Sequence, residues 1–294
     1  MAHQKHSQGA RVCLCADDFG MDEGVNTAVL RLIEMERVHA TSCMVGAPAW
    51  RSGASALRQL DAAGVDVGLH LDMTEFPLLP GSRRSLRGLM VTSLLGWLDH
   101  AKMMAEIRAQ FDAFEDALGR APAFVDGHQH VHQLPGIRGA LLKEMGVRYA
   151  TVLPWVRSSA GPGAQEAPAV DLRTTLKAVI ITALGSRGLR TEAVKGGVAQ
   201  NAALLGVYDF QGGPDRYRAL LAAWLKAAGD ADLLMCHPSA ANSASDPIAS
   251  ARHAEYEVLL ADNVPAMLRS CGVALMPMSR ILHTANASRD DAEP

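Results

Sequence analysis

The sequence has no strong excess of either charge and no apolar run long enough to cross a bilayer. Its 28 basic and 31 acidic residues give a formal net charge of −3 over 294 residues, a balance that disfavours nucleic acid as a partner. The longest clearly apolar stretch near the middle, residues 178–184, is far shorter than the roughly 20 residues that span a membrane. We therefore expect no nucleic-acid partner and no integral membrane segment.

Secretory signals, paired cysteines and aromatic side chains are also scarce. Residues 1–10 are polar and lack the apolar core of a secretory signal, so we expect a cytoplasmic protein. The five cysteines are an odd number and mostly stand in apolar runs, which favours reduced packing thiols over a disulfide framework. Aromatic residues make up 5% of the chain, which leaves few side chains, chiefly the four tryptophans, on which a ligand could stack.

Short apolar runs alternate with amphipathic helical segments along most of the chain. This pattern predicts an α/β fold, with a distorted (β/α) TIM-like barrel of seven or eight mostly parallel strands as first choice and a doubly wound open sheet as second. We expect one domain over residues 11–283, flexible tails at 1–10 and 284–294, a long loop at 74–93 and no assignable structure at 157–205. The predicted strands end near residues 17, 48, 72, 132, 154, 238 and 278.

The first apolar run, residues 13–16, ends in two adjacent carboxylates, Asp17 and Asp18, before Phe19 and Gly20. Charged side chains are tolerated in a buried strand only at its end. Because neighbouring side chains on a strand point to opposite sides, the two carboxylates are expected to have different roles unless the strand breaks there. Taken alone, the pair is better explained as one helix-capping and one solvated aspartate, and only residues elsewhere in the chain favour a functional role.

Three histidines, His128, His130 and His132, alternate along the run that follows residue 124. Alternation along an extended chain would place all three on one side, although a solvated edge or loop is the alternative. Together with Asp18 and His70, they make a bound divalent metal the better interpretation. One carboxylate and two neutral imidazoles leave coordination positions open for water and substrate, and open positions imply catalysis.

A further histidine, His237, closes the apolar run 233–236 and precedes Pro238, which stops the strand. Functional groups of parallel α/β folds gather at the carboxyl ends of the strands, so we expect His237 and Asp126 at the same rim as the other candidates. For His237 alone, a hydrogen-bonding role at the strand end is the alternative.

Four motifs together resemble a known family. They are Ala-Asp-Asp-Phe-Gly at 16–20, Gly-Leu-His-Leu at 68–71, Asp-Gly-His-Gln-His-Val-His at 126–132 and Met-Cys-His-Pro at 235–238. In order and approximate spacing they resemble the YdjC-like (ChbG/HpnK) carbohydrate deacetylases, a family that includes chitooligosaccharide deacetylases and hopanoid-associated proteins. The resemblance covers residues 11–281 and implies a distorted (β/α) barrel that removes N-acetyl groups from amino sugars with one divalent metal ion.

The resemblance also implies roles for individual residues. By motif position, Asp18, His70 and His128 look like the metal ligands, Asp17 like the catalytic base and His237 like its partner acid.

Three additional residues are candidates for orienting the ligands or the substrate. Asp126 or His130 could fix the tautomers of the metal-binding histidines. Several relatives carry an arginine close to the site near the strand predicted here at 147–154, a position flanked in this chain by Arg148 and Arg157. Arg148 is therefore our candidate for contacting the substrate.

The chemistry fits these residues without the family name. Amide hydrolysis needs an activated water, a stabilised oxyanion and a proton for the departing amine. A divalent metal with Asp17 and His237 could supply all three. The donor set suits zinc or manganese and leaves magnesium open. The expected partner is an N-acetylated sugar or glycolipid, and the rival functions are a metal-dependent phosphoesterase and a catalytically silent sugar-binding or regulatory barrel.

Overall fold

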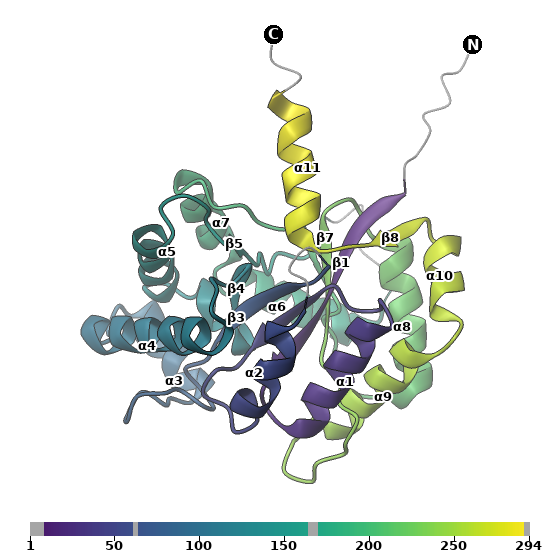
Figure 1. Cartoon of the computed structure of the whole chain (residues 1–294), viewed down its shortest axis with the longest axis horizontal. Coiled ribbons are helices and arrows are strands. Elements are labelled where there is room, and N and C mark those ends of the chain that lie inside the picture. Colours follow the sequence, from purple (N-terminus) through teal and green to yellow (C-terminus); the bar gives the residue numbers. More distant parts are fainter. Residues whose placement is uncertain (1–8, 61–63, 164–169, 291–294) are drawn as a thin grey trace.

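A sheet of parallel strands lies at the centre of the computed structural model, and helices surround it (Figure 1). The structure describes residues 9–60, 64–163 and 170–290. The strand order is β5-β4-β3-β2-β1-β7-β6, with β8 paired to β1, and each pair is parallel. The strands are β1 (Ala10–Phe19), β2 (Ala40–Cys43), β3 (Asp66–Leu71), β4 (Phe124–Gly127), β5 (Trp155–Val156), β6 (Leu204–Leu205), β7 (Asp232–Cys236) and β8 (Val273–Leu275).

The two edges of this sheet approach each other. Beside the short strands β5 and β6, the backbone N–H of Val156 donates to the carbonyl of Ala199 at 2.9 Å, and that of Leu204 donates to Ala160 at 2.7 Å. These bonds join the edges without a regular ladder between the two strands. The sheet is thus curled into the distorted (β/α) barrel that the sequence predicts, and this prediction is confirmed.

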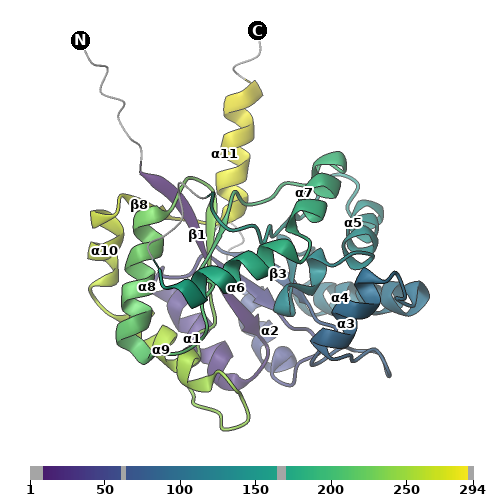
Figure 2. The same ribbon diagram turned by 180° about the vertical axis from the view of Figure 1, so that it is seen from behind.

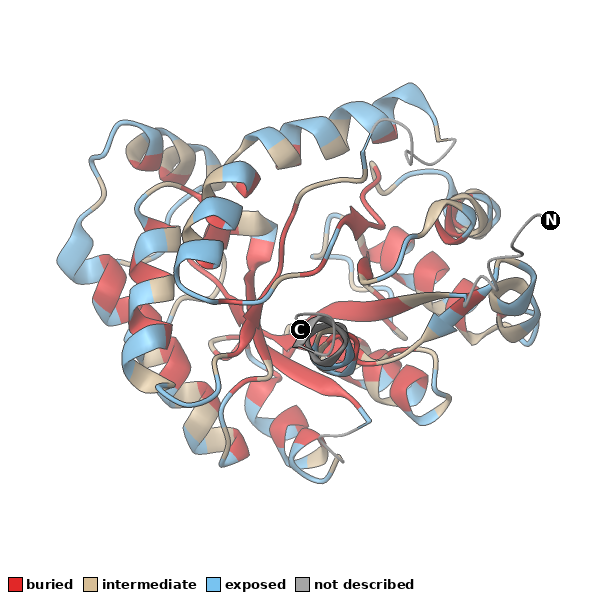
Figure 3. Ribbon diagram, turned by 90° about the horizontal axis from the view of Figure 1, so that it is seen from above, coloured by how far each residue is buried: buried red, intermediate tan, exposed pale blue. Residues whose placement is uncertain are grey.

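Helices cover the outside of the curled sheet, with buried residues on their inner faces and exposed residues outside (Figure 3). Figure 2 shows α6 crossing the side opposite to the view of Figure 1, while α11 projects away from the body. No helix within the described ranges is both long and apolar enough to cross a bilayer. The helices are α1 (Glu23–Glu34), α2 (Trp50–Arg58), α3 (Leu86–Leu94), α4 (His100–Leu118), α5 (Ile137–Arg148), α6 (Leu172–Ala183), α7 (Ser186–Lys195), α8 (Gly213–Ala227), α9 (Ala249–Leu260), α10 (Val264–Ser270) and α11 (Met278–Asp290), with a 3₁₀ helix, η1, at His128–Gln133.

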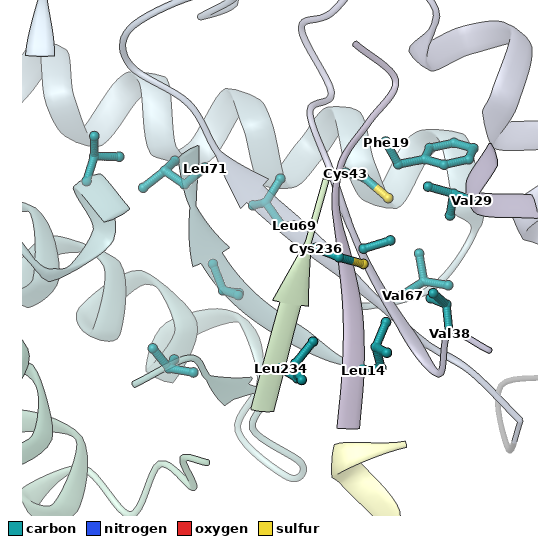
Figure 4. Close-up of a cluster of buried hydrophobic side chains, with 14 of the residues drawn as sticks. Leu14, Phe19, Val29, Val38, Cys43, Val67, Leu69, Leu71, Leu234 and Cys236 are labelled. Carbon is teal, nitrogen blue, oxygen red and sulfur yellow. The ribbon is translucent and has the colours of Figure 1, made fainter. Parts of the chain in front are cut away.

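Strand β1 lies at the centre of the apolar core. Every residue of β1 from Val12 to Phe19 is buried, and its side chains pack against those of neighbouring strands, as Leu14 and Leu234 illustrate in Figure 4. Cys43 and Cys236 belong to the same apolar cluster and are free thiols. This burial agrees with the prediction that the cysteines are packing residues.

The predicted strand at 147–154 is wrong. Helix α5 continues through Arg148, and the strand of this region, β5, begins only at Trp155. An ion pair of 2.8 Å between Glu144 and Arg148, spaced i and i+4, supports the last helical turn. Pro154 therefore precedes the strand, whereas we had expected it to end one.

The predicted extended run through residue 132 is also wrong, because β4 ends at Gly127 and the chain turns immediately into η1. Gln129 and His130 adopt left-handed backbone conformations, with φ of 53° and 60°. The side chains of this segment consequently do not alternate between two faces.

The two regions that showed no clear periodicity contain helices. The expected loop at 74–93 includes most of α3, and the unassigned segment 157–205 contains α6, α7 and β6. Pro265 stands in the first turn of α10, as expected for a helix that restarts at a proline. Residues 1–8 of the expected amino-terminal tail, and residues 291–294 of the carboxyl-terminal one, lie outside the described residues, while α11 runs through the boundary proposed at 284.

Candidate functional site

Strand β1 breaks at the acidic pair. Asp18 has a left-handed φ of 68°, and the pairing of β1 with β2 shifts register between Ala16 and Phe19. Simple alternation therefore does not apply, and both carboxylates are buried, with Asp17 2% and Asp18 1% exposed. A backbone conformation that is costly outside glycine is a frequent feature of functional sites.

One carboxylate oxygen of Asp18 contacts two histidines. Its Oδ1 lies 3.3 Å from Nε2 of His70 and 3.0 Å from Nδ1 of His128. The three residues are buried, and their donor atoms all lie within 4.8 Å of one another. The structure therefore brings together the three residues that the sequence analysis proposed as metal ligands.

Each of the two histidines has another carboxylate on its second ring nitrogen. Nδ1 of His70 lies 2.6 Å from Oδ1 of Asp126, and Nε2 of His128 lies 3.2 Å from Oε1 of Glu75. Burial opposes charge on both rings, but the surrounding carboxylates outweigh it and raise the pKa of His70 to about 9 and that of His128 to about 10. These contacts orient the rings with their other nitrogens toward Asp18.

Asp17 has a different environment, dominated by Arg157. The fully buried guanidinium contacts both oxygens of Asp17 at 2.6 Å and lies 2.6 Å from Oδ2 of Asp126. Burial alone would raise the pKa of Asp17, yet Arg157 lowers it below its usual range. Asp17 is consequently ionised at neutral pH.

His237 faces this carboxylate, with its Nε2 3.8 Å from Oδ2 of Asp17. Burial lowers the pKa of His237 to about 4, against the attraction of Asp18 and Asp17. The imidazole is thus neutral at pH 7, and its buried Nδ1 has no hydrogen-bond partner among the described residues.

Helix α9 supplies two charged side chains to the site. Arg252 donates to Oδ2 of Asp18 at 2.6 Å, and Glu255, one turn later, accepts the backbone N–H of His237 at 2.5 Å. Asp18 therefore turns one oxygen to the histidines and the other to an arginine. Burial raises the pKa of Glu255 to about 7.

The remaining candidates lie outside the histidine and aspartate cluster or at its edge. His130 contacts Ser159 at 3.1 Å, and His132 contacts the carbonyl of Arg157 at 2.9 Å, so each of the three alternating histidines has its own partner. Arg148 lies on α5, where its guanidinium pairs with carboxylates of α4 and α5. None of the contacts described for Arg148 reaches the cluster, and its contact with the substrate stays a prediction.

Comparison with known proteins gives the family. The model of YdjC-like proteins matches residues 11–270, which is most of the chain. This chain belongs to the YdjC-like family. The resemblance read from the four motifs is thereby confirmed.

Several curated relatives of this YdjC-like chain are named for an activity on carbohydrates. It is 33% identical over 179 residues to a carbohydrate deacetylase of Homo sapiens, covering 54% of this chain and 53% of that protein. It is 32% identical over 210 residues to one of Mus musculus, covering 63% and 65%, and 34% identical over 128 residues to a chitooligosaccharide deacetylase of Enterobacter sp. (strain 638), covering 42% and 50%. The matches thus span between half and two thirds of the length of these relatives.

Solved structures share the fold of the YdjC-like chain. A protein of Enterococcus faecalis V583, described as a candidate cellobiose-phosphate cleavage protein, superposes with a TM-score of 0.69 at 17% identity, covering 93% of this chain and 99% of that one. A peptidoglycan N-acetylglucosamine deacetylase superposes with a TM-score of 0.50 at 10% identity, covering 94% and 89%. At these identities the likeness concerns architecture alone.

The donor set of the YdjC-like chain fits a divalent metal. A second group of potential ligands, Asp17, His70 and Asp126, also lies within 4.8 Å, but Arg157 already pairs with both of its carboxylates. In the group built on Asp18, Oδ1 of that carboxylate faces a ring nitrogen of His70 and one of His128, and a carboxylate with two neutral imidazoles is a donor set that suits a divalent ion.

Sequence reasoning missed three charged residues of this site and passed over a fourth, Arg157, in favour of Arg148. Arg157 follows β5 directly, so it stands at the carboxyl end of a strand like the other candidates, and only the misplaced strand at 147–154 obscured it. Arg252 and Glu255 are spaced i and i+3 in an alanine-rich helix, a pattern indistinguishable from a solvated face without the structure. Glu75 lies in the loop after β3 and carried no signal.

Proposed function

We propose that this chain is a metal-dependent hydrolase that removes the N-acetyl group from an N-acetylated amino sugar. The observation that supports this most is that the two aspartates at the end of β1 have different neighbours. The donor atoms of Asp18, His70 and His128 lie within 4.8 Å of one another, and the adjacent Asp17 has its Oδ2 3.8 Å from Nε2 of His237. A Lewis acid beside a carboxylate and an imidazole is the set that amide hydrolysis requires.

Asp18, His70 and His128 would hold the ion, which when bound acidifies a water and polarises the amide carbonyl. Asp17 is the proton acceptor. Arg157 keeps its carboxylate ionised and fixes both oxygens. A carboxylate of such low basicity receives a proton from the attacking water only transiently, and readily gives it up again.

His237 is the group that passes a proton to the departing amine. Its ring is neutral in the resting site because burial lowers its pKa to about 4, and in its protonated form it is therefore a strong acid. Breaking the C–N bond leaves an amine that needs one proton. The proton that Asp17 takes from water passes to His237, whose Nε2 lies 3.8 Å from Oδ2 of Asp17, and His237 gives it to the amine. Acetate and a free amino sugar are the products.

The substrate class rests on the relatives. Those named carbohydrate deacetylase and chitooligosaccharide deacetylase share about a third of the aligned residues with this chain. We propose as substrate an N-acetylglucosamine unit in an oligosaccharide, or the same unit carried by a glycolipid.

The direct test is release of acetate from N-acetylglucosamine oligomers of two to six units. The protein would be stripped with a chelator and reloaded in parallel with zinc, manganese and magnesium. We expect acetate release that disappears on stripping and returns with one of the ions. The ion that restores turnover identifies the cofactor.

Two outcomes would replace this proposal with its rivals. Hydrolysis of p-nitrophenyl phosphate without acetate release would indicate a phosphoesterase. Binding of the oligomers with no acetate released under any of the ions would indicate a sugar-binding barrel.

A further inference from the structure

Phe210 stands beside the site in a strained backbone conformation. Its φ is 60°, a left-handed value that is strained for a residue with a Cβ. Neighbouring contacts hold it there, since Asp209 pairs with Arg216 at 2.5 Å and the following residues, Gly212 and Gly213, also have positive φ. Strain of this kind persists only where the surroundings fix it, and it is concentrated at functional sites.

The ring of Phe210 contacts the proposed acid of the reaction. Its centroid lies 5.3 Å from that of His237, with the two planes nearly perpendicular at 85°. Lys177 of α6 places its ammonium 4.1 Å from the same centroid and donates to the carbonyl of Tyr208 at 2.6 Å. One face of the ring is therefore covered by a cation, while the residue as a whole remains half-buried.

The four tryptophans are poorly placed for contacting a ligand beside His237. Trp50, Trp155 and Trp224 are buried in the core, at 2–4% exposure, and Trp97 lies between α3 and α4 at 71% exposure. Phe210 is thus the aromatic residue that combines partial exposure with contact to His237.

We propose that Phe210 is the platform on which the sugar ring packs beside His237. This inference rests on the proposed function and adds to it a residue that determines binding. The C–H groups on one face of a pyranose are apolar and carry slight positive charge, so they pack against the negative face of an aromatic ring. Lys177 would fix the height and tilt of that ring from α6.

The test compares two substitutions that fill similar space. Phe210→Tyr keeps the aromatic face, whereas Phe210→Leu keeps bulk and removes it. We expect Phe210→Leu to raise KM for the N-acetylglucosamine oligomer about tenfold with kcat nearly unchanged, the effect of losing roughly 55 Å² of apolar contact. Phe210→Tyr should stay close to the wild type. Calorimetry in an Asp17→Asn background should show the same tenfold loss of affinity for the oligomer.

Trp97→Leu is the matched control, because it removes an exposed aromatic residue away from the site, and it should change neither constant. Equal behaviour of Phe210→Leu and wild type, or equal losses in Phe210→Leu and Phe210→Tyr, would overturn the platform. So would a wild-type protein that binds no oligomer. If the wild type binds the oligomer through Phe210 but releases no acetate, the hydrolase proposal fails and the platform stands.

Discussion

At the scale of single residues, two adjacent aspartates are given unequal roles by the cations they meet. Asp17 is held at both oxygens by Arg157, whereas Asp18 gives one oxygen to Arg252 and turns the other to two histidines. Only the second arrangement leaves a carboxylate oxygen available to a metal ion. The proposed roles of base and ligand therefore follow from the arginines as much as from the aspartates.

Proton competition should control metal binding at this site. Without metal, His70 and His128 have pKa values raised to about 9 and about 10, so both are protonated at pH 7 and an ion must displace about two protons. Affinity should therefore rise up to about 100-fold per pH unit between pH 6 and 8. Competition against a fluorescent chelator at several pH values measures this slope.

The same titration has an internal control. His100→Ala removes an exposed histidine at the start of α4 and should leave the slope unchanged, whereas His128→Ala should lower both affinity and slope. A metal affinity independent of pH would show that these two histidines are not ligands.

At the level of single residues, the sequence identified the histidines and aspartates but not their cationic partners. Asp17, Asp18, His70, His128 and His237 stand in recognisable motifs at strand ends. Their charged neighbours come from distant segments, 140 positions away for Arg157 and 234 for Arg252. Such pairs depend on how the barrel closes, which no local pattern encodes.

At the scale of elements, helix α9 supports both halves of the site. It carries Arg252 to Asp18 and Glu255 to the backbone of His237, while Tyr208 donates to the other carboxylate oxygen of Glu255 at 2.7 Å. The two residues lie one helical turn apart on the same buried face. A shift of α9 would move the proposed metal ligand and the proposed acid together.

Buried Glu255 should make the stability of the protein depend on pH. Its pKa is raised by burial from 4.5 to about 7, so between these values the folded protein holds a proton that the unfolded chain releases. Its contribution to stability therefore falls as pH rises from about 4.5 to 7, by about 3 kcal/mol. The groups that face it are Tyr208, Arg252, Asp17 and the N–H of His237.

Urea unfolding of the wild type and Glu255→Gln at pH 5 and pH 7 measures this contribution. The glutamine variant should lose less stability than the wild type over this interval, because an amide does not titrate. Glu257→Gln, an exposed neighbour on α9, should behave like the wild type. Equal pH dependence in wild type and Glu255→Gln would contradict the account of α9.

Among the elements, the strongly periodic helices and the apolar strands were predictable, and the short strands were not. Strand β5 is two residues long and follows Pro154. Its short apolar sequence is a weaker strand signal than the longer apolar run at 147–153, which was predicted as the strand instead. In η1, left-handed Gln129 and His130 break a pattern that alternates perfectly in the sequence. A Cβ at Gly127 would lie 2.9 Å from the backbone nitrogen of His132, so the glycine permits the chain to turn this tightly.

At the scale of the whole molecule, the curled sheet brings together strand ends that are far apart in the sequence. Strands β1, β3, β4 and β7 contribute their carboxyl ends to one rim, and β2 lies between β1 and β3. This convergence was predictable from strand periodicity and the rule for parallel sheets. The segment 157–205 was not, since its α6 presents apolar residues outward and buries few, which removes the periodic signal.

The central claim, that Asp17 and Asp18 have unequal roles, is tested most directly by metal content and acetate release measured on the same two variants. Asp18→Asn should lose the ion, as judged by elemental analysis after dialysis, and lose turnover with it. Asp17→Asn should keep one ion per chain while acetate release falls at least about 100-fold. Full turnover in Asp17→Asn, or a wild-type metal content in Asp18→Asn, would contradict the account.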